Sequence, residues 1–365
     1  MDAPLRAVSR GGAGRREGRL SGRTPPEAPA PDPQTLPPAP ADADAREGSA
    51  TGLERLGRRL LVPLALGVLV VLGLVLTANP RELARSLERF DLRLLVPVLA
   101  LSLVNYALRF VRWEVYLRRL GVRLSLWKSL MVFLVGFLLS VTPGKAGELG
   151  KAWLVRELGG GPALRVVPAV LAERVTDVLG VVLLLAVGAL PLPGGPWFLA
   201  LGLAATAGVV LVLTWRGLAD WAFRLLRRLP VVGPRVPHLV ELYETLRTLL
   251  SPGLLLVALL LAVIAWGAEG VGFYLVVREY APGADVLLSV FNYTAANFVG
   301  GVSMLPGGLG AAEGSLSALL HAQGLDTADA NSITLVIRGA TLWFAVLLGL
   351  VALPVVGRWL AGRKG

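Results

Sequence analysis

The sequence contains no cysteine and only two histidines, His238 and His321. The lack of cysteine excludes disulfides, thiolate nucleophiles and cysteine-based metal sites. Two histidines are too few to suggest a histidine-based metal site. We therefore expect no metal site and no cofactor.

Charged side chains are also scarce. They make up 17% of the chain, whereas 55% of it is hydrophobic and the mean hydropathy is +0.66. Leucine- and valine-rich runs of membrane-spanning length recur from residue 60 to residue 356. Because these runs are continuous rather than alternating, they indicate helices and not β-barrel strands. The pattern predicts an all-α polytopic protein of the cell membrane (inner or plasma membrane).

The ends of the chain differ from the middle in composition. Residues 1–54 are rich in proline and arginine and have little apolar surface to bury, which predicts a disordered cytoplasmic tail. Alternatively, translation starts downstream of residue 50. Residues 55–360 form the predicted membrane domain, and residues 361–365 a basic tail. Residues 216–250 mix arginines with aromatic and aliphatic residues, which predicts a cytoplasmic amphipathic segment or, alternatively, a solvated linker helix.

The formal net charge is +11. In a soluble protein this charge would suggest nucleic acid as a partner. Here the basic residues gather in loops between apolar runs, as the positive-inside rule describes, and can meet anionic lipid headgroups. We expect membrane lipids, and not nucleic acid, as partners.

The loop charges predict how the apolar segments cross the membrane. The segments lie near residues 60–77, 94–117, 126–142, 166–190, 197–214, 253–277, 286–305 and 332–356. If the basic clusters are cytoplasmic, 126–165 and 286–330 must each enter the membrane and return to the side from which they came. The prediction is six full transmembrane helices plus two oppositely oriented re-entrant hairpins, an inverted-repeat-like arrangement with both termini in the cytoplasm. One feature counts against it: the 78–93 loop is predicted to be external and carries four arginines.

Each predicted hairpin turns at a Pro-Gly break that leads through small residues to a glutamate. Proline removes a backbone donor and glycine loosens a helix, so neither break suits a lipid-facing span. Broken backbone at membrane depth survives where protein buries it or a watery cavity solvates it. The residues of the two breaks are therefore candidates for a transport site: Pro143, Gly144, Lys145, Gly147 and Glu148 in the first, and Pro306, Gly307, Gly308, Gly310 and Glu313 in the second.

Ionisable residues inside the apolar segments are further candidates. Each costs roughly 2.5–3.5 kcal/mol at the centre of a bilayer, so each must have a structural or functional role. Arginines suit an anion clamp, because a guanidinium binds phosphate with two hydrogen bonds. The carboxylates suit a gate, a proton site or a contact to an amine-bearing headgroup, and the alternative is that such pairs only hold helices together. The candidates are Arg109, Arg112, Glu173, Arg174, Asp177, Glu269 and Arg338, with Lys151 at the same depth as Glu148.

Three motifs resemble the lysylphosphatidylglycerol synthase transmembrane family, also described as flippase-like. They are the turn from Pro143 to Glu148, the Glu-Arg-x-x-Asp sequence from Glu173 to Asp177, and the turn from Pro306 to Glu313. The resemblance covers about residues 55–360 and implies translocation of a lipid between leaflets, with aminoacyl-phosphatidylglycerol as the best-known cargo class. Bifunctional members carry a soluble aminoacyl-transfer domain after the membrane part. This chain looks like the stand-alone membrane half, so a separate lipid-synthesising enzyme is an expected partner. A glycolipid, a polyprenyl-phosphate-linked sugar or another phospholipid then fits equally well as cargo.

We therefore expect a lipid flippase-like transporter for a charged (amino)phospholipid or a related lipid, and not an enzyme. Residues 144–152 look like an ATP-binding loop, but they have five residues between the glycines and end in Ala152 instead of Ser or Thr. Transport is thus not expected to be ATP-driven by this chain. The alternatives are a scaffold for lipid-modifying enzymes and, less favoured, an intramembrane lipid-modifying enzyme, for which no nucleophile or metal cluster is evident. A homo-oligomer is left open.

Overall fold

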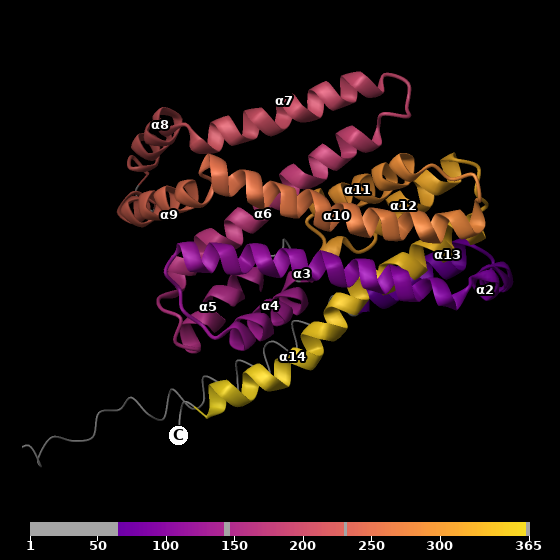
Figure 1. Ribbon diagram of the computed structural model, residues 1–365, viewed down its shortest axis with the longest axis horizontal. Helices are drawn as coiled ribbons and strands as arrows, with labels where there is room; N and C mark the ends of the chain where they lie inside the picture. Colours follow the sequence, from indigo (N-terminus) through magenta and orange to yellow (C-terminus); the bar gives the residue numbers. More distant parts are fainter. Residues whose placement is uncertain (1–64, 142–146, 230–231, 363–365) are drawn as a thin grey trace, which may run out of the picture. The chain divides into compact units, whose positions relative to one another are not determined.

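The structure is a computed structural model that describes residues 65–141, 147–229 and 232–362. Within these residues every regular element is helical (Figure 1). The all-α class is therefore confirmed for the described part of the chain. The tail 1–54, the terminal residues 363–365 and the candidates Pro143, Gly144 and Lys145 lie outside the described residues.

The helices follow one another along the chain with short connections. In order they are Ala65–Thr77, α2 (Pro80–Arg89), η1 (Leu92–Leu94), α3 (Leu95–Arg119), α4 (Leu126–Ser140), α5 (Gly150–Glu157), α6 (Ala163–Gly188), α7 (Gly195–Thr214), α8 (Arg216–Leu226), η3 (Gly233–Arg235), α9 (Val236–Leu249), α10 (Pro252–Tyr280), α11 (Val286–Val302), η4 (Pro306–Gly308), α12 (Ala311–Ala322), α13 (Thr327–Arg338), the π-helical η5 (Gly339–Trp343) and α14 (Phe344–Ala361).

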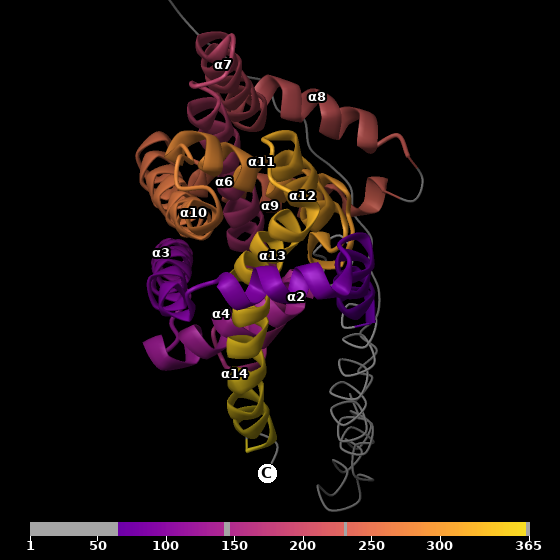
Figure 2. The same cartoon turned by 90° about the vertical axis from the view of Figure 1, so that its right-hand side faces the viewer.

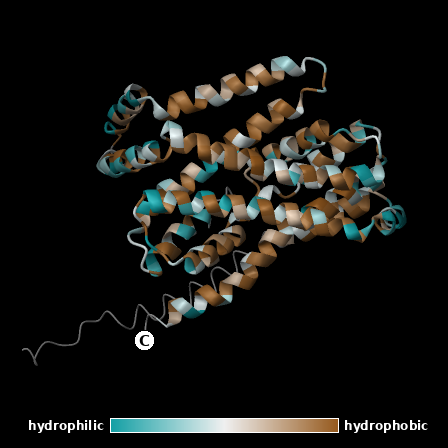
Figure 3. Ribbon diagram, viewed as in Figure 1, coloured by the Kyte–Doolittle hydropathy of each residue, from teal (hydrophilic) through white to brown (hydrophobic). Residues whose placement is uncertain are grey.

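Among the described residues, four continuous helices are long and apolar enough to cross a membrane, or five spans if the bent pair at the start is counted as one. The four are Leu92–Arg119, Gly195–Thr214, Pro252–Tyr280 and Thr327–Ala361. Helix α6 has 26 residues but carries the charges of the Glu-Arg-x-x-Asp motif. Figure 3 shows apolar residues along the middle of the long helices and polar residues at their ends. These lengths support a multi-pass protein, while the count of six spans and two hairpins stays a prediction.

The predicted 78–93 loop is largely a helix. The Ala65–Thr77 helix ends and the chain bends by 99° into α2, where Asn79 caps the new helix and Pro80 stands in its first turn. Proline is common at the first position of a helix, because the N–H that it lacks has no partner inside the helix there. Ser86 and Arg89 of α2 both bind Asp329 at the start of α13. This pairing across 240 residues could not be read from the loop composition.

The described part of the first predicted hairpin contains two short helices, α4 and α5, that pack on each other. Helix α4 also packs against α14, and the two backbones approach closely at one point. A Cβ atom added at Gly349 of α14 would lie 2.8 Å from the carbonyl oxygen of Leu134 in α4. Glycine at this position lets α14 lie against the hairpin.

The second predicted hairpin consists of α11, η4 and α12, with α11 packed on α12 (Figures 1 and 2). The break from Pro306 to Gly310 contains three glycines with positive φ: Gly307 at 62°, Gly308 at 69° and Gly310 at 86°. L-residues rarely adopt such angles, so glycine is required there. A Cβ atom at Gly308 would also lie 3.0 Å from the Cα of Gly300 in α11. The turn is therefore tight and folded back on its own helix.

Long helices surround the two hairpins. Helix α3 packs along α10, and α6 packs against both α10 and α11. Helix α7 packs on α6 and exposes large apolar side chains, among them Trp197 and Leu201. The amphipathic segment 216–250 forms two helices, α8 and α9, whose Phe223 and Tyr243 rings lie 5.7 Å apart. Its position on a membrane surface stays a prediction.

Candidate functional site

Seven charged residues from three parts of the fold meet in one buried network, which we call the first charge cluster. Helix α3 contributes two arginines, the second arm of the first hairpin contributes a glutamate and a lysine, and α6 contributes the Glu-Arg-x-x-Asp motif. Its members are Arg109, Arg112, Glu148, Lys151, Glu173, Arg174 and Asp177. The structure thus joins side chains from distant parts of the sequence, for which the sequence predicts only a common depth.

Asp177 lies at the centre of this cluster. Its carboxylate oxygens lie 2.6 Å from Nη2 of Arg112, 3.1 Å from Nη2 of Arg174 and 3.6 Å from Nη2 of Arg109. Arg174 also contacts Glu148 at 3.0 Å. The side chains of Arg112 and Asp177 are 1% and 6% exposed. A buried ion needs such partners, because its attraction to them must replace the water that it has lost.

Lys151 of α5 holds the first hairpin to α6. Its Nζ lies 2.5 Å from Glu173 and 4.5 Å from the centre of the Trp113 ring of α3. A Cβ atom at Gly136 of α4 would lie 2.6 Å from the Cδ of this lysine, so a glycine leaves room for it. The cation–π contact and the ion pair together satisfy a cation that is almost fully buried. The sequence analysis placed Lys151 at the depth of Glu148 without assigning it to the site, and the structure brings it into the cluster.

The first charge cluster holds more positive than negative charge. The cluster has four cations and three carboxylates, and both arginines of α3 pair with the same carboxylate, that of Asp177. Three buried nitrogens of the α3 arginines have no hydrogen-bond partner: Nε and Nη1 of Arg112 and Nε of Arg109. Buried donors of this kind are costly when they are left unpaired. The carboxylate oxygens Oε2 of Glu148 and Oδ2 of Asp177 also lack a hydrogen-bond partner among the described residues, so the ion pairs of the cluster leave both donors and acceptors unused.

The second charge cluster lies at the other hairpin and consists of Arg338 and Glu313. Arg338 at the end of α13 binds Glu313 of α12 at 2.6 Å and the carbonyl oxygen of Gly307 at 3.2 Å. The other carboxylate oxygen of Glu313 accepts the N–H of Gly310 at 2.7 Å and so caps α12. A carboxylate in the first turn also suits the positive end of the helix dipole. The Pro306–Glu313 motif thus folds around one ion pair.

Glu269 of α10 lies between the two clusters. It accepts a hydrogen bond of 2.7 Å from the hydroxyl of Tyr293 in α11. It also interacts electrostatically with Arg109 of the first cluster and Arg338 of the second. Among the described residues, Glu269 has no ion pair within 4 Å. The other four described carboxylates of the site each contact a cation: Glu148, Glu173, Asp177 and Glu313.

The two hairpins touch close to their breaks. A Cβ atom added at Gly307 would lie 3.3 Å from Cγ1 of Val141, the last described residue before the first break. Nearby, the guanidinium of Arg109 lies 5.5 Å from the Phe137 ring of α4 and 6.0 Å from the Trp266 ring of α10. The end of α4, just before the first break, and the second break are therefore neighbours in space.

Comparison with known proteins identifies the family. The model of the lysylphosphatidylglycerol synthase TM region matches residues 64–349. This chain belongs to that family. It is 26% identical over 307 residues to a UPF0104 membrane protein of Methanothermobacter thermautotrophicus, covering 79% of this chain and 90% of that protein. It is 25% identical over 312 residues to a UPF0104 membrane protein of Pyrococcus horikoshii, covering 78% and 93%.

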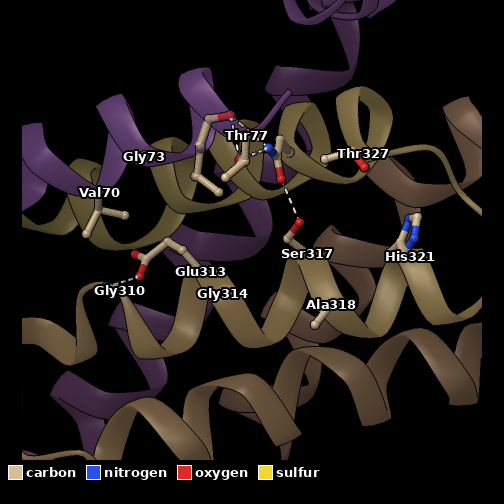
Figure 4. Close-up of a pocket in the computed structure, with 12 residues that line it drawn as sticks. Val70, Gly73, Thr77, Gly310, Glu313, Gly314, Ser317, Ala318, His321 and Thr327 are labelled. Carbon is tan, nitrogen blue, oxygen red and sulfur yellow. Dashed lines mark hydrogen bonds between the residues drawn. The ribbon is translucent and has the colours of Figure 1, made fainter. Parts of the chain in front are cut away.

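The part of the chain that matches the lysylphosphatidylglycerol synthase TM region contains both charge clusters and both Pro-Gly breaks. It also contains a cavity of about 460 Å³ between the Ala65–Thr77 helix and helices α12 and α13 (Figure 4). Glu313 lines one part of this cavity, and His321 and Thr327 line another. Sequence reasoning missed this cavity, because it is formed by segments from opposite ends of the membrane domain.

No metal centre is evident in the part of the chain that the structure describes, where no three metal-ligating side chains come together. The acidic residues of the site face arginines, a lysine or a tyrosine instead. The arrangement suits the binding of charged and polar groups.

Proposed function

We propose that this protein moves a lipid with a charged headgroup, such as an (amino)phospholipid, from one leaflet of the membrane to the other. The contact between the hairpin tips at Val141 and Gly307, with buried charges on each hairpin, carries the proposal. Charges at membrane depth commonly mark a substrate path, and paired helix breaks commonly mark its centre. The headgroup would pass between the clusters while the acyl chains stay in the bilayer.

The proposed topology has six full spans and two re-entrant hairpins of opposite sense, with both termini in the cytoplasm. Its support is that α4 packs on α5, that α11 packs on α12, and that the tips of these pairs meet. Helices α4 and α11, with 15 and 17 residues, are short for a full crossing, which needs about 20. Opposed half-crossings that meet at their tips are a basis for alternating access.

The first charge cluster favours a phosphate-bearing lipid. It has an excess of one positive charge, and unpaired donors belong to the guanidinium groups of Arg109 and Arg112. A planar guanidinium can bind two oxygens of one phosphate. Asp177 already pairs with both arginines, so a phosphate that binds them would compete with the carboxylate of Asp177. Such competition lets the cluster release its cargo as well as bind it.

We propose that transport is driven downhill or by protons or other ions, and not by ATP hydrolysis on this chain. Glu269 is the best proton site, since it is buried and has a tyrosine rather than a cation as its hydrogen-bond partner. The titratable groups that interact with it are Tyr293 of α11, Tyr106 and Arg109 of α3, Arg338 of α13 and Asp177 of α6. Protonation of Glu269 would change its attraction to the arginines of both clusters.

Lipid movement in vesicles tests the proposal. The purified protein is reconstituted with phosphatidylglycerol or lysylphosphatidylglycerol that carries a reporter, and the loss of reporter from the outer leaflet is followed. We expect Glu148→Gln and Glu313→Gln to lower the rate at least about tenfold, the equivalent of ~1.4 kcal/mol of barrier. The control Glu241→Gln changes an exposed residue of α9 outside both clusters. Wild-type protein that moves lipid no faster than empty vesicles would overturn the proposal.

A scaffold for lipid-modifying enzymes is the competing function, and it predicts another result. In that case Glu148→Ala and Glu313→Ala would be tolerated in cells, whereas removal of residues 1–54 would abolish function. A separate lipid-synthesising enzyme is a proposed partner under either function. An intramembrane enzyme would instead change the amount of a lipid in whole-cell extracts before its sidedness.

A further inference from the structure

The cavity beside Glu313 shares only this residue with the ion pairs of the two charge clusters, and no part of the proposed path accounts for the rest of its lining. It has a volume of about 460 Å³, within the range of about 300–1,000 Å³ that small-molecule sites occupy. Figure 4 shows Glu313, Ser317 and His321 in a row along α12, all facing the Ala65–Thr77 helix. We call this cavity the headgroup bay.

The hydrogens of three polar side chains of the bay, Thr77, Ser317 and Asn331, are already used inside the protein. Ser317 donates to Asn331 at 2.6 Å. Asn331 in turn donates to the carbonyl oxygen of Leu74 at 2.8 Å and to the hydroxyl of Thr77 at 3.0 Å. Thr77 donates to the same carbonyl oxygen of Leu74. These side chains therefore turn oxygen lone pairs, and not hydrogens, toward a ligand.

The ends of the bay have the same character. At one end Glu313 uses one lone pair of each oxygen, for Arg338 and for the N–H of Gly310, and a carboxylate offers about four such positions. At the other end Nδ1 of His321 lies 3.0 Å from the carbonyl oxygen of Leu325. A carbonyl can only accept, so the tautomer with its hydrogen on Nδ1 makes this bond, and that tautomer leaves Nε2 as an acceptor.

Glycines give the bay its room. A Cβ atom at Gly73 of the first helix or at Gly314 of α12 would meet nothing within 4 Å, and both residues line the bay. Glycine in a helix costs stability, so helix formation does not account for these two positions. Larger side chains there would fill the space without displacing the protein around them.

We propose that the headgroup bay binds the part of the cargo that donates hydrogen bonds, a primary ammonium or sugar hydroxyls, while the phosphate is left for the arginines. This inference rests on the proposed function and adds a class of headgroup to it. A row of acceptors recognises N–H and O–H groups and gives no advantage to a quaternary ammonium, which has none to donate. The bay thus selects phosphatidylethanolamine-like or glycosylated lipids over phosphatidylcholine.

Native mass spectrometry of the purified full chain tests the inference without any transport. The protein is equilibrated with equal amounts of phosphatidylethanolamine, phosphatidylcholine, a glucosyl-diacylglycerol and phosphatidic acid, and the retained lipids are counted. We expect phosphatidylethanolamine or the glucosyl lipid to be retained at least about fivefold over phosphatidylcholine, as one additional hydrogen bond would give. Preference for phosphatidylethanolamine indicates an amine-bearing cargo, and preference for the glucosyl lipid indicates a cargo with a sugar headgroup.

Two glycine variants locate the binding. Gly314→Leu fills the bay and should remove the preference. Gly208→Leu makes the same change on α7, where a side chain also meets nothing within 4 Å, and should leave the preference intact. Equal retention of all lipids by the wild type overturns the inference, as does an undiminished preference in folded Gly314→Leu. If the preference is found but vesicles show no lipid movement, the proposed function fails and the bay is a lipid-binding site alone.

Discussion

Asp177 shows at the scale of a residue how the buried charges depend on one another. One carboxylate faces the guanidinium groups of Arg109, Arg112 and Arg174, and the most buried of these is Arg112. The sequence indicated that both signs of charge lie at this depth. It could not indicate which cation meets which carboxylate, because these pairs join helices whose packing the sequence does not specify.

Replacing Asp177 by asparagine should destabilise the protein by roughly 3–5 kcal/mol, because Arg112 would remain buried without its anion. The change would be measured as the loss of thermal stability of the purified protein in detergent. Glu244→Gln serves as the control, since Glu244 is well exposed and binds the exposed Arg216. The pKa of Glu244 is lowered by its hydrogen bond from Arg216, but water screens exposed pairs, and little stability should be lost there. Equal losses in the two variants would contradict this account of the cluster.

At the scale of the element, the sequence predicted the helix breaks better than the helix contacts. The breaks at Pro143 and Pro306 were predicted from proline and glycine, and the second is seen as a turn with three positive φ angles. The bend of 99° before α2 was not predicted, although Asn79 and Pro80 are typical of a helix start. The arginines of α2 were counted as loop charges, and the contact of this helix with α13 depends on packing across the whole chain.

The crossing of α4 and α14 provides a test at this scale. Gly349→Ala should lower the free energy of unfolding by about 1–3 kcal/mol, because the new methyl group would lie against the backbone of α4 and force the helices apart. Gly357→Ala is a control on the same helix, where a Cβ meets nothing within 4 Å. It should be neutral or slightly stabilising, since alanine is the better helix former. Unfolding by denaturant would compare the two, and a Gly349→Ala variant as stable as the control would refute the close crossing.

At the scale of the whole molecule, family and structure agree on a multi-pass helical membrane protein. Composition alone was sufficient to predict this class, because continuous apolar runs of this length are typical of membrane-spanning helices. The sense of the hairpins depends on loop charge, which is a bias and not a geometric constraint. The short distance between Val141 and Gly307 adds a constraint, because any arrangement in the membrane must keep the end of α4 beside the second break.

The sidedness of the hairpin ends tests the central claim most directly, and the lack of native cysteine makes the measurement clean. Single cysteines replace Arg123 and Arg165, which flank α4 and α5, and Gly283 and Ala322, which lie at the ends of α11 and α12. All four positions are exposed, and a fifth cysteine at the exposed Arg224 of α8 reports on the segment that is predicted to be cytoplasmic. Whole cells and inverted vesicles are labelled with a membrane-impermeant maleimide. We predict labelling of the first pair from the cytoplasm and of the second pair from outside. Labelling of Arg123→Cys and Arg165→Cys from opposite sides, or of all four from one side, would contradict the account.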